Sequence, residues 1–358
     1  MGARWLFLDS HGAKHLPPLL AALRDRGHSV VYAGGSAVLR DRLATESIAT
    51  VGLRIRAKLD PCAWRNVRKM FTRLKPDAVV TIGSRDAYVG VRARGGMQRA
   101  GPALFARRGA YAALSPFDPV ERRVYGAAGV DHVVTVSHAL AAHFENRGMD
   151  RSRLRTIYTA VVAPGPDACR APDLRLRLGI PRDRFLLGML ANYRRVKGAE
   201  TLLDALARLR SQGANVHLAI AGAGYRGRLR RRAGRLGIAD RLSWVGPVVS
   251  AEEFTPAVDC LVVPSRGDGL PVSAIEATLC ATPVVGTRVG GIPEILDGER
   301  GGWLATPRDA HALAQKLQQV LGAPAERTRR AQAVLDRNRD LFSLDRCASG
   351  YERLLDLV

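Results

Sequence analysis

Strand-length apolar runs alternate with helix-length amphipathic segments along nearly the whole sequence. The first part has such runs at residues 4–9 and 131–136. After a proline-rich break at residues 162–172, the alternation begins again with apolar runs at residues 185–190 and 216–222. Because alternating strands and helices favour parallel sheets covered on both faces, we expect an α/β protein with two Rossmann-like, doubly wound domains that face each other.

The length of the chain agrees with two domains. A chain of 358 residues exceeds the usual size of one compact domain. The break divides it into residues 1–163 and 164–343, followed by a final segment at 344–358. Since doubly wound sheets bind ligands at the carboxyl ends of their strands, we expect the ligand site in the cleft between the domains.

Cysteine usage and hydropathy indicate the compartment. The five cysteines are scattered and form no C-x-x-C pair, which favours a reducing compartment and neither a disulfide framework nor a zinc site. The apolar run near the start is too short for a signal peptide, and no run approaches the roughly 20 residues of a membrane span. We therefore predict a cytoplasmic protein.

The chain is strongly basic, with a formal net charge of +22. Its densest cluster, residues 226–235, carries six arginines on an expected helix. A solvated helix face is the simpler interpretation, and a surface for anionic lipid headgroups or a phosphorylated acceptor is the sharper one. No recognition motif and no interleaved aromatic residues accompany the arginines, so we expect no nucleic-acid partner.

The stretch from residue 259 to residue 294 predicts an anion site. An apolar run at 259–264 suits a buried strand, and a glycine-containing loop follows it. Pro271 suits the first position of a helix that continues over residues 272–280. Unpaired N–H groups and the helix dipole favour a diphosphate at such an N-terminus.

Two carboxylates border this expected site. Asp268 lies in the loop, and Glu276 falls near the second turn of the helix. A carboxylate that accepts hydrogen bonds from two vicinal hydroxyls can hold a ribose or a hexose. Taken singly, the two residues are as well explained as an ordinary turn residue and a solvated helix residue.

A second polar loop follows the expected strand at residues 185–190. Asn192, Arg194 and Lys197 precede a helix that should begin near Gly198. Two cations beside a helix N-terminus suit a diphosphate whose charge grows as a sugar leaves it. A solvated basic loop is the alternative interpretation of these residues alone.

Together these segments resemble the donor site of retaining glycosyltransferases of family 4, which have the GT-B fold. The string GDGLPVSAIEATLCATPVVGTRVGGIPEILDG carries the two acidic residues with seven residues between them, the PVV strand and the GG-x-PE loop of that family. The resemblance covers nearly the whole chain. It is strong from Phe185 to Leu296 and moderate before Ala163.

The resemblance implies roles for the donor-site residues. Glu276 would bind the nucleotide ribose, and Asp268 stands where the family usually has Glu near the hydroxyls of the transferred sugar. Lys197 and Arg194 would clamp the donor phosphates, so the candidate catalytic residues are Asp268, Lys197 and Arg194. The candidate donor-binding residues are Asn192, Gly222, Gly269, Leu270, Pro271 and Glu276.

The first domain would bind the acceptor. Many family members have a catalytic-site His after the fourth strand, where this sequence has Arg107 and Arg108. That departure and the string GSRDAYVG resemble a branch that builds bacterial lipopolysaccharide or other envelope glycans. His11 could reach the cleft, although a lone loop His is more often polar surface. The acceptor-side candidates are His11, Gly12, Ser84, Asp86, Arg107 and Arg108.

The resemblance implies a retaining transferase that moves sugar from a UDP- or GDP-sugar to a hydroxyl of a glycan or glycolipid acceptor, in cell-envelope polysaccharide or lipopolysaccharide synthesis. It would need neither a metal ion nor a cofactor. The helix at 344–358 would cross back onto the first domain. The enzyme would be cytoplasmic, with a peripheral contact to the inner face of the membrane. The alternative is a non-catalytic or differently reacting nucleotide-sugar-binding protein of the same fold, such as an epimerase.

Overall fold

A computed structural model gives the structure of the chain. It describes residues 2–13, 15–57, 60–95, 97, 101–111, 119–165, 174–224, 226–247 and 251–357. The chain forms two compact units: unit 1 comprises Met1–Ala160 with Leu344–Val358, and unit 2 comprises Val161–Ser343. Most of the expected proline-rich linker, residues 166–172, lies outside the described residues.

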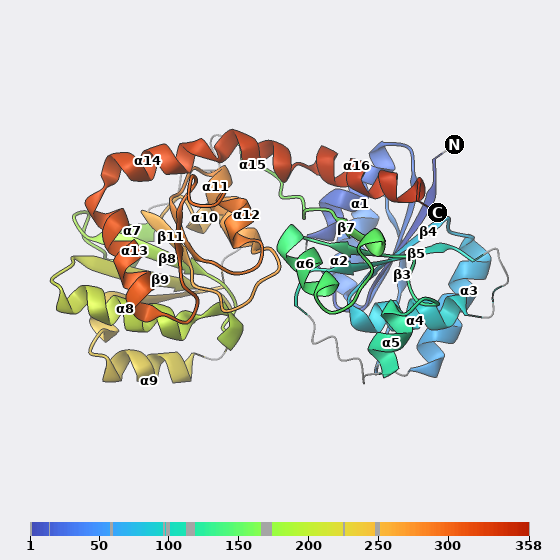
Figure 1. Ribbon diagram of the computed structural model, residues 1–358, viewed down its shortest axis with the longest axis horizontal. Coiled ribbons are helices and arrows are strands. Elements are labelled where there is room, and N and C mark those ends of the chain that lie inside the picture. Colours follow the sequence, from blue (N-terminus) through green and yellow to red (C-terminus); the bar gives the residue numbers. More distant parts are fainter. Residues whose placement is uncertain are drawn as a thin grey trace. The chain divides into compact units, whose positions relative to one another are not determined.

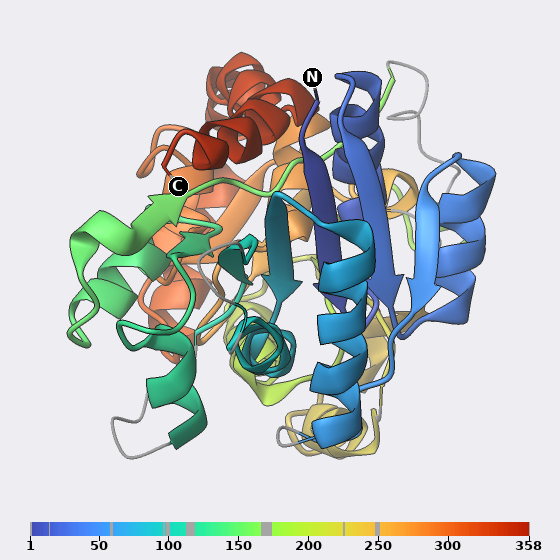
Figure 2. The same cartoon turned by 90° about the vertical axis from the view of Figure 1, so that its right-hand side faces the viewer.

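Unit 1 contains a parallel sheet with helices on both faces (Figures 1 and 2). Its strands are β1 (Arg4–Asp9), β2 (Ser29–Gly34), β3 (Ala49–Gly52), β4 (Ala78–Ile82), β5 (Ala103–Arg108), β6 (His132–Thr135) and β7 (Leu154–Thr156). Its helices are α1 (Leu16–Asp25), α2 (Ala37–Thr45), α3 (Pro61–Leu74), α4 (Ser84–Arg94), α5 (Pro119–Tyr125), α6 (His138–Glu145) and α16 (Leu344–Leu355). The described strands lie in the order β3-β2-β1-β4-β5-β6-β7, so the winding changes direction between β1 and β4.

The C-terminal helix α16 is part of unit 1, where it lies beside α1 (Figure 1). The ring of Tyr351 is buried 6.2 Å from Trp5 and 6.1 Å from Phe7. Glu352 accepts a hydrogen bond from the His28 ring and pairs with Arg26. The expectation that the last helix returns to the first domain is therefore confirmed.

Unit 2 contains a second parallel sheet. Its strands are β8 (Phe185–Leu190), β9 (Val216–Ala221), β10 (Leu242–Gly246), β11 (Cys260–Val263), β12 (Val284–Thr287) and β13 (Trp303–Ala305). Its helices are α7 (Leu174–Leu178), α8 (Ala199–Ser211), α9 (Gly227–Arg235), α10 (Ala251–Phe254), α11 (Val272–Leu279), α12 (Ile292–Ile295), α13 (Ala310–Gly322), α14 (Pro324–Ala333) and α15 (Leu335–Leu341). The order of the described strands is β10-β9-β8-β11-β12-β13, and the winding changes direction between β8 and β11.

The predicted fold class, two doubly wound Rossmann-like sheets, is confirmed. Its physical basis is visible in the central strands, such as β9, in which all six residues are buried. The sequence of a strand that helices cover on both faces is a nearly continuous run of apolar residues. Helix α6 begins at a capping serine, because the Ser137 side chain accepts the N–H of Leu140 at 3.2 Å.

Two further findings concern membrane-spanning helices and cysteines. No helix in the described ranges combines the length and the apolar character that crossing a membrane requires. Cys62, Cys260 and Cys347 are free thiols, and Cys169 lies outside the described residues.

Candidate functional site

The candidate donor site lies at the carboxyl edge of the sheet in unit 2. The loop after β8 contains Asn192, Arg194 and Lys197, and the loop after β11 contains Asp268. β8 and β11 are hydrogen-bonded neighbours with parallel direction, and the winding reverses between them. Loops on either side of such a reversal separate and leave a crevice where ligands bind in this class of fold.

Backbone contacts hold the two loops together. Gly198 has φ +74°, and a Cβ atom there would lie 1.8 Å from the carbonyl oxygen of Pro264. The N–H of Arg266 donates to the carbonyl of Val196 at 2.7 Å. Only glycine permits both this backbone conformation and this approach, so the Lys197-Gly198 pair fixes where the first loop meets the second.

Lys197 and Asp268 contact each other across the two loops. The lysine Nζ donates to Asp268 Oδ2 at 2.6 Å, and the Ser265 hydroxyl donates to the same oxygen at 3.3 Å. The lysine side chain is 29% exposed and the aspartate side chain 12% exposed. A partly buried cation with residual exposure can still receive a second anionic group, because an ammonium has three donors.

Asn192 and Gly222 connect this site to β9. The Asn192 side-chain oxygen accepts the N–H of Ala223 at 3.2 Å. Gly222 has φ +148°, and a Cβ atom there would lie 2.0 Å from the carbonyl oxygen of Ala191. The glycine therefore lets the turn after β9 pack against the loop after β8. Arg194 is exposed, and its side chain forms no ion pair with a described residue.

The N-terminus of α11 is the third part of the site. Pro271 occupies the N-cap and the helix begins at Val272, one residue later than the sequence suggested. No side chain caps this end, so its first N–H groups are available to an anion. Gly269 and Leu270 are buried, and the carbonyl of Gly269 accepts the N–H of Gly291 at 2.9 Å. Glu276 is half-buried in the second turn of α11, as expected.

Sequence reasoning missed Glu200 in the first turn of α8. Its carboxylate pairs with Arg266 and with Arg228, each at 3.0 Å. These contacts connect the loop after β11 to α8 and α9. The only advance signal was an acidic residue in the first turn of a helix, where the dipole favours it.

At the carboxyl edge of the sheet in unit 1, a buried aspartate organises the loop after β1. The carboxylate of Asp9 accepts the N–H groups of His11, Gly12 and Ala13 and the hydroxyl of Tyr32. Asp9 is fully buried, and it was not among the predicted site residues. Its contacts fix the position of His11, whose side chain is 57% exposed.

Asp86 lies beside this loop, at the point where the winding of unit 1 reverses. Its Oδ1 accepts the N–H of Ser10 at 3.2 Å, and its buried Oδ2 has no hydrogen-bond partner and lies 3.9 Å from Nδ1 of His11. Burial raises the pKa of the Asp86 carboxyl to about 7. The structure thus brings His11, Gly12 and Asp86 together.

Arg107 and Arg108 are buried at the end of β5. Arg107 donates to the hydroxyl of Thr159 at 2.8 Å, and Arg108 donates to the hydroxyl of Ser84. Burial, together with the nearby charge of Arg107, lowers the pKa of the His15 ring to about 3. Both arginines therefore have partners inside unit 1, and Ser84 is one of them.

A metal cluster is not formed by the described side chains: no group of three or more His, Cys, Asp or Glu residues in these ranges could hold an ion. The structure brings together the Lys197 ammonium, the Asp268 carboxylate and the N-terminus of α11, whereas Arg194 lines a different pocket with Glu200 and Arg228. This arrangement suits an anionic ligand that also carries hydroxyl groups.

Comparisons with known proteins identify the class. Residues 13–163 match the family model described as Glycosyltransferase Family 4, and residues 184–323 match the model described as Glycosyl transferases group 1. The chain therefore contains glycosyltransferase domains of group 1 and family 4.

Curated relatives cover part of the chain. The D-inositol 3-phosphate glycosyltransferase of Thermobifida fusca is 32% identical over 229 residues, which are 57% of this chain and 52% of that protein. The enzyme of the same name from Xylanimonas cellulosilytica is 32% identical over 62% of this chain and 57% of its own length. This chain thus spans about half the length of the curated relatives it matches.

Solved structures agree on the fold. Anabaena Alr3699/HepE in complex with UDP and glucose has a TM-score of 0.83 at 20% identity, with 99% of this chain and 100% of that chain covered. WaaG, a glycosyltransferase involved in lipopolysaccharide biosynthesis, has a TM-score of 0.74 at 16% identity, with 99% of each chain covered. The fold is that of GT-B glycosyltransferases.

Proposed function

We propose that this protein is a retaining glycosyltransferase that moves a sugar from a nucleotide-sugar donor to an acceptor hydroxyl. One observation carries the proposal: Lys197 and Asp268, from loops on either side of the strand-order reversal in unit 2, meet at 2.6 Å, and Lys197 lines one pocket with Pro271 and Ser273 at the uncapped N-terminus of α11. A diphosphate needs the cation and the N–H groups, and a sugar needs the carboxylate.

The donor diphosphate would bind Lys197, Arg194 and the N–H groups of α11. The ammonium of Lys197 keeps Asp268 through one N–H and retains two more donors for phosphate oxygens. As the bond between the sugar and the phosphate breaks, negative charge grows on the phosphate, and these groups stabilise it without a metal ion. The acceptor hydroxyl attacks from the face of the leaving group, and the departing phosphate takes its proton.

The carboxylates would hold the sugars. Glu276, half-buried on α11, binds the nucleotide ribose, and Asp268 accepts hydroxyls of the transferred sugar through the oxygen that does not contact Lys197. The complex of HepE with UDP and glucose supports UDP-glucose as the first donor to assay, with a GDP-sugar as the second.

The acceptor would bind unit 1 near His11, Gly12 and Asp86. Arg107, Arg108 and Ser84 would shape this side indirectly, because their side chains are hydrogen-bonded within the unit. The names of the curated relatives suggest an inositol phosphate as the acceptor, and the likeness to WaaG suggests a glycan or glycolipid of the cell envelope. We place the reaction in the cytoplasm, with the arginines of residues 226–235 facing the membrane.

A non-catalytic or differently reacting nucleotide-sugar-binding protein, such as an epimerase, is the second candidate. Two observations favour it: Asp268 replaces the usual Glu, and arginines stand where many family members have a His. Such a protein would bind the donor through the same residues of unit 2 and release no sugar.

Donor titration separates the two candidates. Calorimetry with UDP-glucose and a GDP-sugar should show binding to the wild type that Lys197→Ala and Glu276→Ala weaken severely while the fold survives. Arg208→Ala, which removes an exposed cation at the far end of α8, is the control. Slow release of free sugar supports the transferase, binding without release supports the second candidate, and near-normal turnover in either site variant refutes the assignment.

A further inference from the structure

Helix α3 of unit 1 presents a row of cations to solvent. Its sequence, PCAWRNVRKMFTRL, contains no acidic residue. Its apolar side, with Ala63, Val67 and Phe71, is buried. Arg65, Lys69 and Arg73 follow one another at intervals of four residues and are exposed, so they lie along one side of the helix.

These three cations have no acidic partner among the described residues. Like charges four residues apart repel each other on a helix, so the row is unfavourable for the helix by itself. Arg68, by contrast, has a structural role: its guanidinium donates to the carbonyl oxygens of Arg92, Ala93 and Gly95 at the end of α4. The row, unlike Arg68, is thus available to a ligand.

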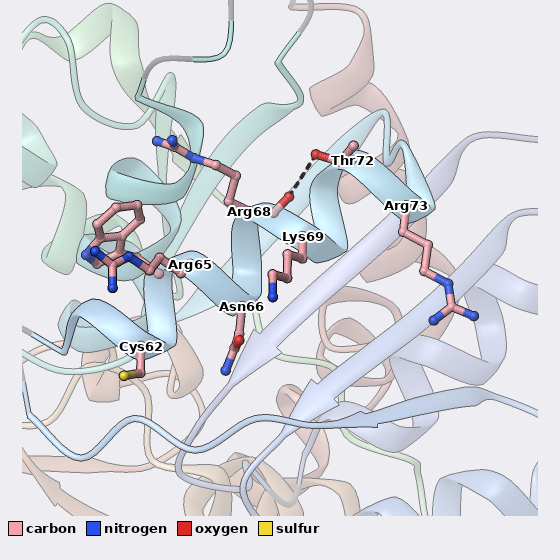
Figure 3. Close-up of a pocket in the computed structure, with 8 residues that line it drawn as sticks. Cys62, Arg65, Asn66, Arg68, Lys69, Thr72 and Arg73 are labelled. Atoms are coloured by element: carbon pink, nitrogen blue, oxygen red, sulfur yellow. Dashed lines mark hydrogen bonds between the residues drawn. The ribbon is translucent and has the colours of Figure 1, made fainter.

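The row borders a concavity of 650 Å³. The described residues that line it all belong to α3, and they include Cys62, Asn66 and Thr72 beside the three cations. Figure 3 shows Asn66 and Lys69 directed to the same side of the helix and Arg68 directed to the opposite side. The guanidinium of Arg65 lies 5.4 Å from the centre of the Trp64 ring, a cation–π contact that limits its freedom.

We propose that the α3 row, defined as Arg65, Lys69 and Arg73, binds a ligand that bears several phosphate groups. Arg forms paired hydrogen bonds to phosphate oxygens and Lys supplies a compact charge. Eight residues of helix extend over about 12 Å, which is long enough for more than one phosphate. Asn66 adds a neutral donor at the same surface.

The ligand chemistry has two sources, a soluble polyphosphorylated compound and a bilayer of anionic phospholipids. The α3 row lies in unit 1, and the candidate donor site lies in unit 2. The proposal therefore does not rest on the glycosyltransferase assignment, and each can fail without the other.

The test compares two variants with the same change in charge. Arg65→Gln, Lys69→Gln and Arg73→Gln together remove the row. Arg177→Gln, Arg182→Gln and Arg208→Gln together remove three exposed arginines of unit 2 that form no ion pair with a described residue. The soluble probe is inositol hexakisphosphate, measured by calorimetry, and the bilayer probe is vesicles of phosphatidylglycerol and phosphatidylcholine, measured by co-sedimentation. Circular dichroism verifies that both variants fold.

We expect the α3 variant to bind at least one of the two probes roughly tenfold or more weakly than the wild type, because up to three charge-assisted contacts are lost. The unit 2 variant should differ from the wild type by less than about twofold. The probe that responds identifies the source. Equal weakening in both variants, no weakening in the α3 variant, or no binding of either probe to the wild type would overturn the proposal. Lys197→Ala is measured in parallel, and loss of the soluble probe in that variant alone would assign its binding to the donor site instead.

Discussion

Replacing Lys197 by alanine tests the chemistry of the candidate donor site most sharply. A hydrogen bond to a charged group contributes about 1.5 to 3 kcal/mol. Loss of the Lys197 contact should therefore weaken UDP binding roughly 10- to 150-fold. The ion pair with Asp268 is only partly buried, so its loss should cost about 1 kcal/mol of folding stability or less.

The effect of Asp268 separates direct binding from general disruption. Without the lysine, the Asp268 carboxylate would face the diphosphate uncompensated, and two unit charges roughly 6 Å apart repel by about 3 kcal/mol at an effective dielectric constant of about 20. Asp268→Asn in the Lys197→Ala background should therefore restore part of the lost UDP affinity. Asp268→Asn alone should leave UDP affinity equal or higher and should weaken binding of the sugar-bearing donor.

These variants form a double-mutant cycle. UDP binding is measured by isothermal titration calorimetry for the wild type, Lys197→Ala, Asp268→Asn and the double variant. Arg208→Ala, at the far end of α8, serves as the control for loss of a positive charge from unit 2. Wild-type affinity for UDP in Lys197→Ala, with the fold intact, would refute the reasoning. A double variant weaker than Lys197→Ala would refute the proposed position of Asp268.

Three further predictions follow from the packing. Gly198→Ala should destabilise unit 2 by about 3 kcal/mol or more in urea unfolding, because its Cβ would collide with the carbonyl of Pro264. The control is Gly213→Ala, at φ +80° with nothing within 4 Å of the added Cβ, which should cost only about 1 kcal/mol. Equal costs would contradict the close approach of the two loops. Because burial raises the pKa of Asp86 to about 7, the folded state binds the proton more tightly than the unfolded state, and stability should fall as the pH rises from about 4 to about 7, by an amount on the order of 4 kcal/mol. Asp86→Asn should flatten that slope in urea unfolding at pH 5 and pH 8, and an unchanged slope would show that another group is responsible. Tyr351→Ala should destabilise unit 1 by about 3 to 5 kcal/mol in thermal unfolding, and Leu357→Ala, at a 40% exposed position, should have little effect. A loss of stability well below this range in Tyr351→Ala would mean that the packing of α16 contributes little to the stability of unit 1.

The central strands could be predicted from the sequence because they are buried on both faces. The predicted run at residues 185–190 coincides with β8, and the predicted run at 216–222 extends one residue beyond β9. The short strands β3, β7 and β13 were not predicted. None of the four residues of β3 is fully buried. The strand therefore lacks the apolar run that marks a central strand.

Parts of the candidate site could be placed from the sequence because the signal is local. Gly198 and the loop before α8, and Asp268 and the loop before α11, follow strands directly, and the carboxyl ends of parallel strands share one edge of the sheet. Asp9 and Glu200 could not be recognised, because their partners come from other elements. Whether Asp9 is a turn residue or the buried acceptor of three backbone N–H groups depends on the packing of β1 against β2 and β4, which no local pattern records.

The burial of Arg107 and Arg108 also lay beyond sequence reasoning. Arginine is almost never fully buried without a partner, and two consecutive arginines at a strand end suggest a solvent-facing or ligand-facing pair. Their partners, Thr159 and Ser84, come from segments on either side in the sequence. The acceptor-side roles of these residues stay predictions.

A crystal structure of the chain with bound UDP, or with GDP if that nucleotide binds more tightly, tests the central claim most directly. We predict that the diphosphate lies within hydrogen-bonding distance of Lys197 Nζ and of the first N–H groups of α11, with the ribose hydroxyls on Glu276. A nucleotide bound in unit 2 away from the loops after β8 and β11, or bound only to unit 1, would contradict it.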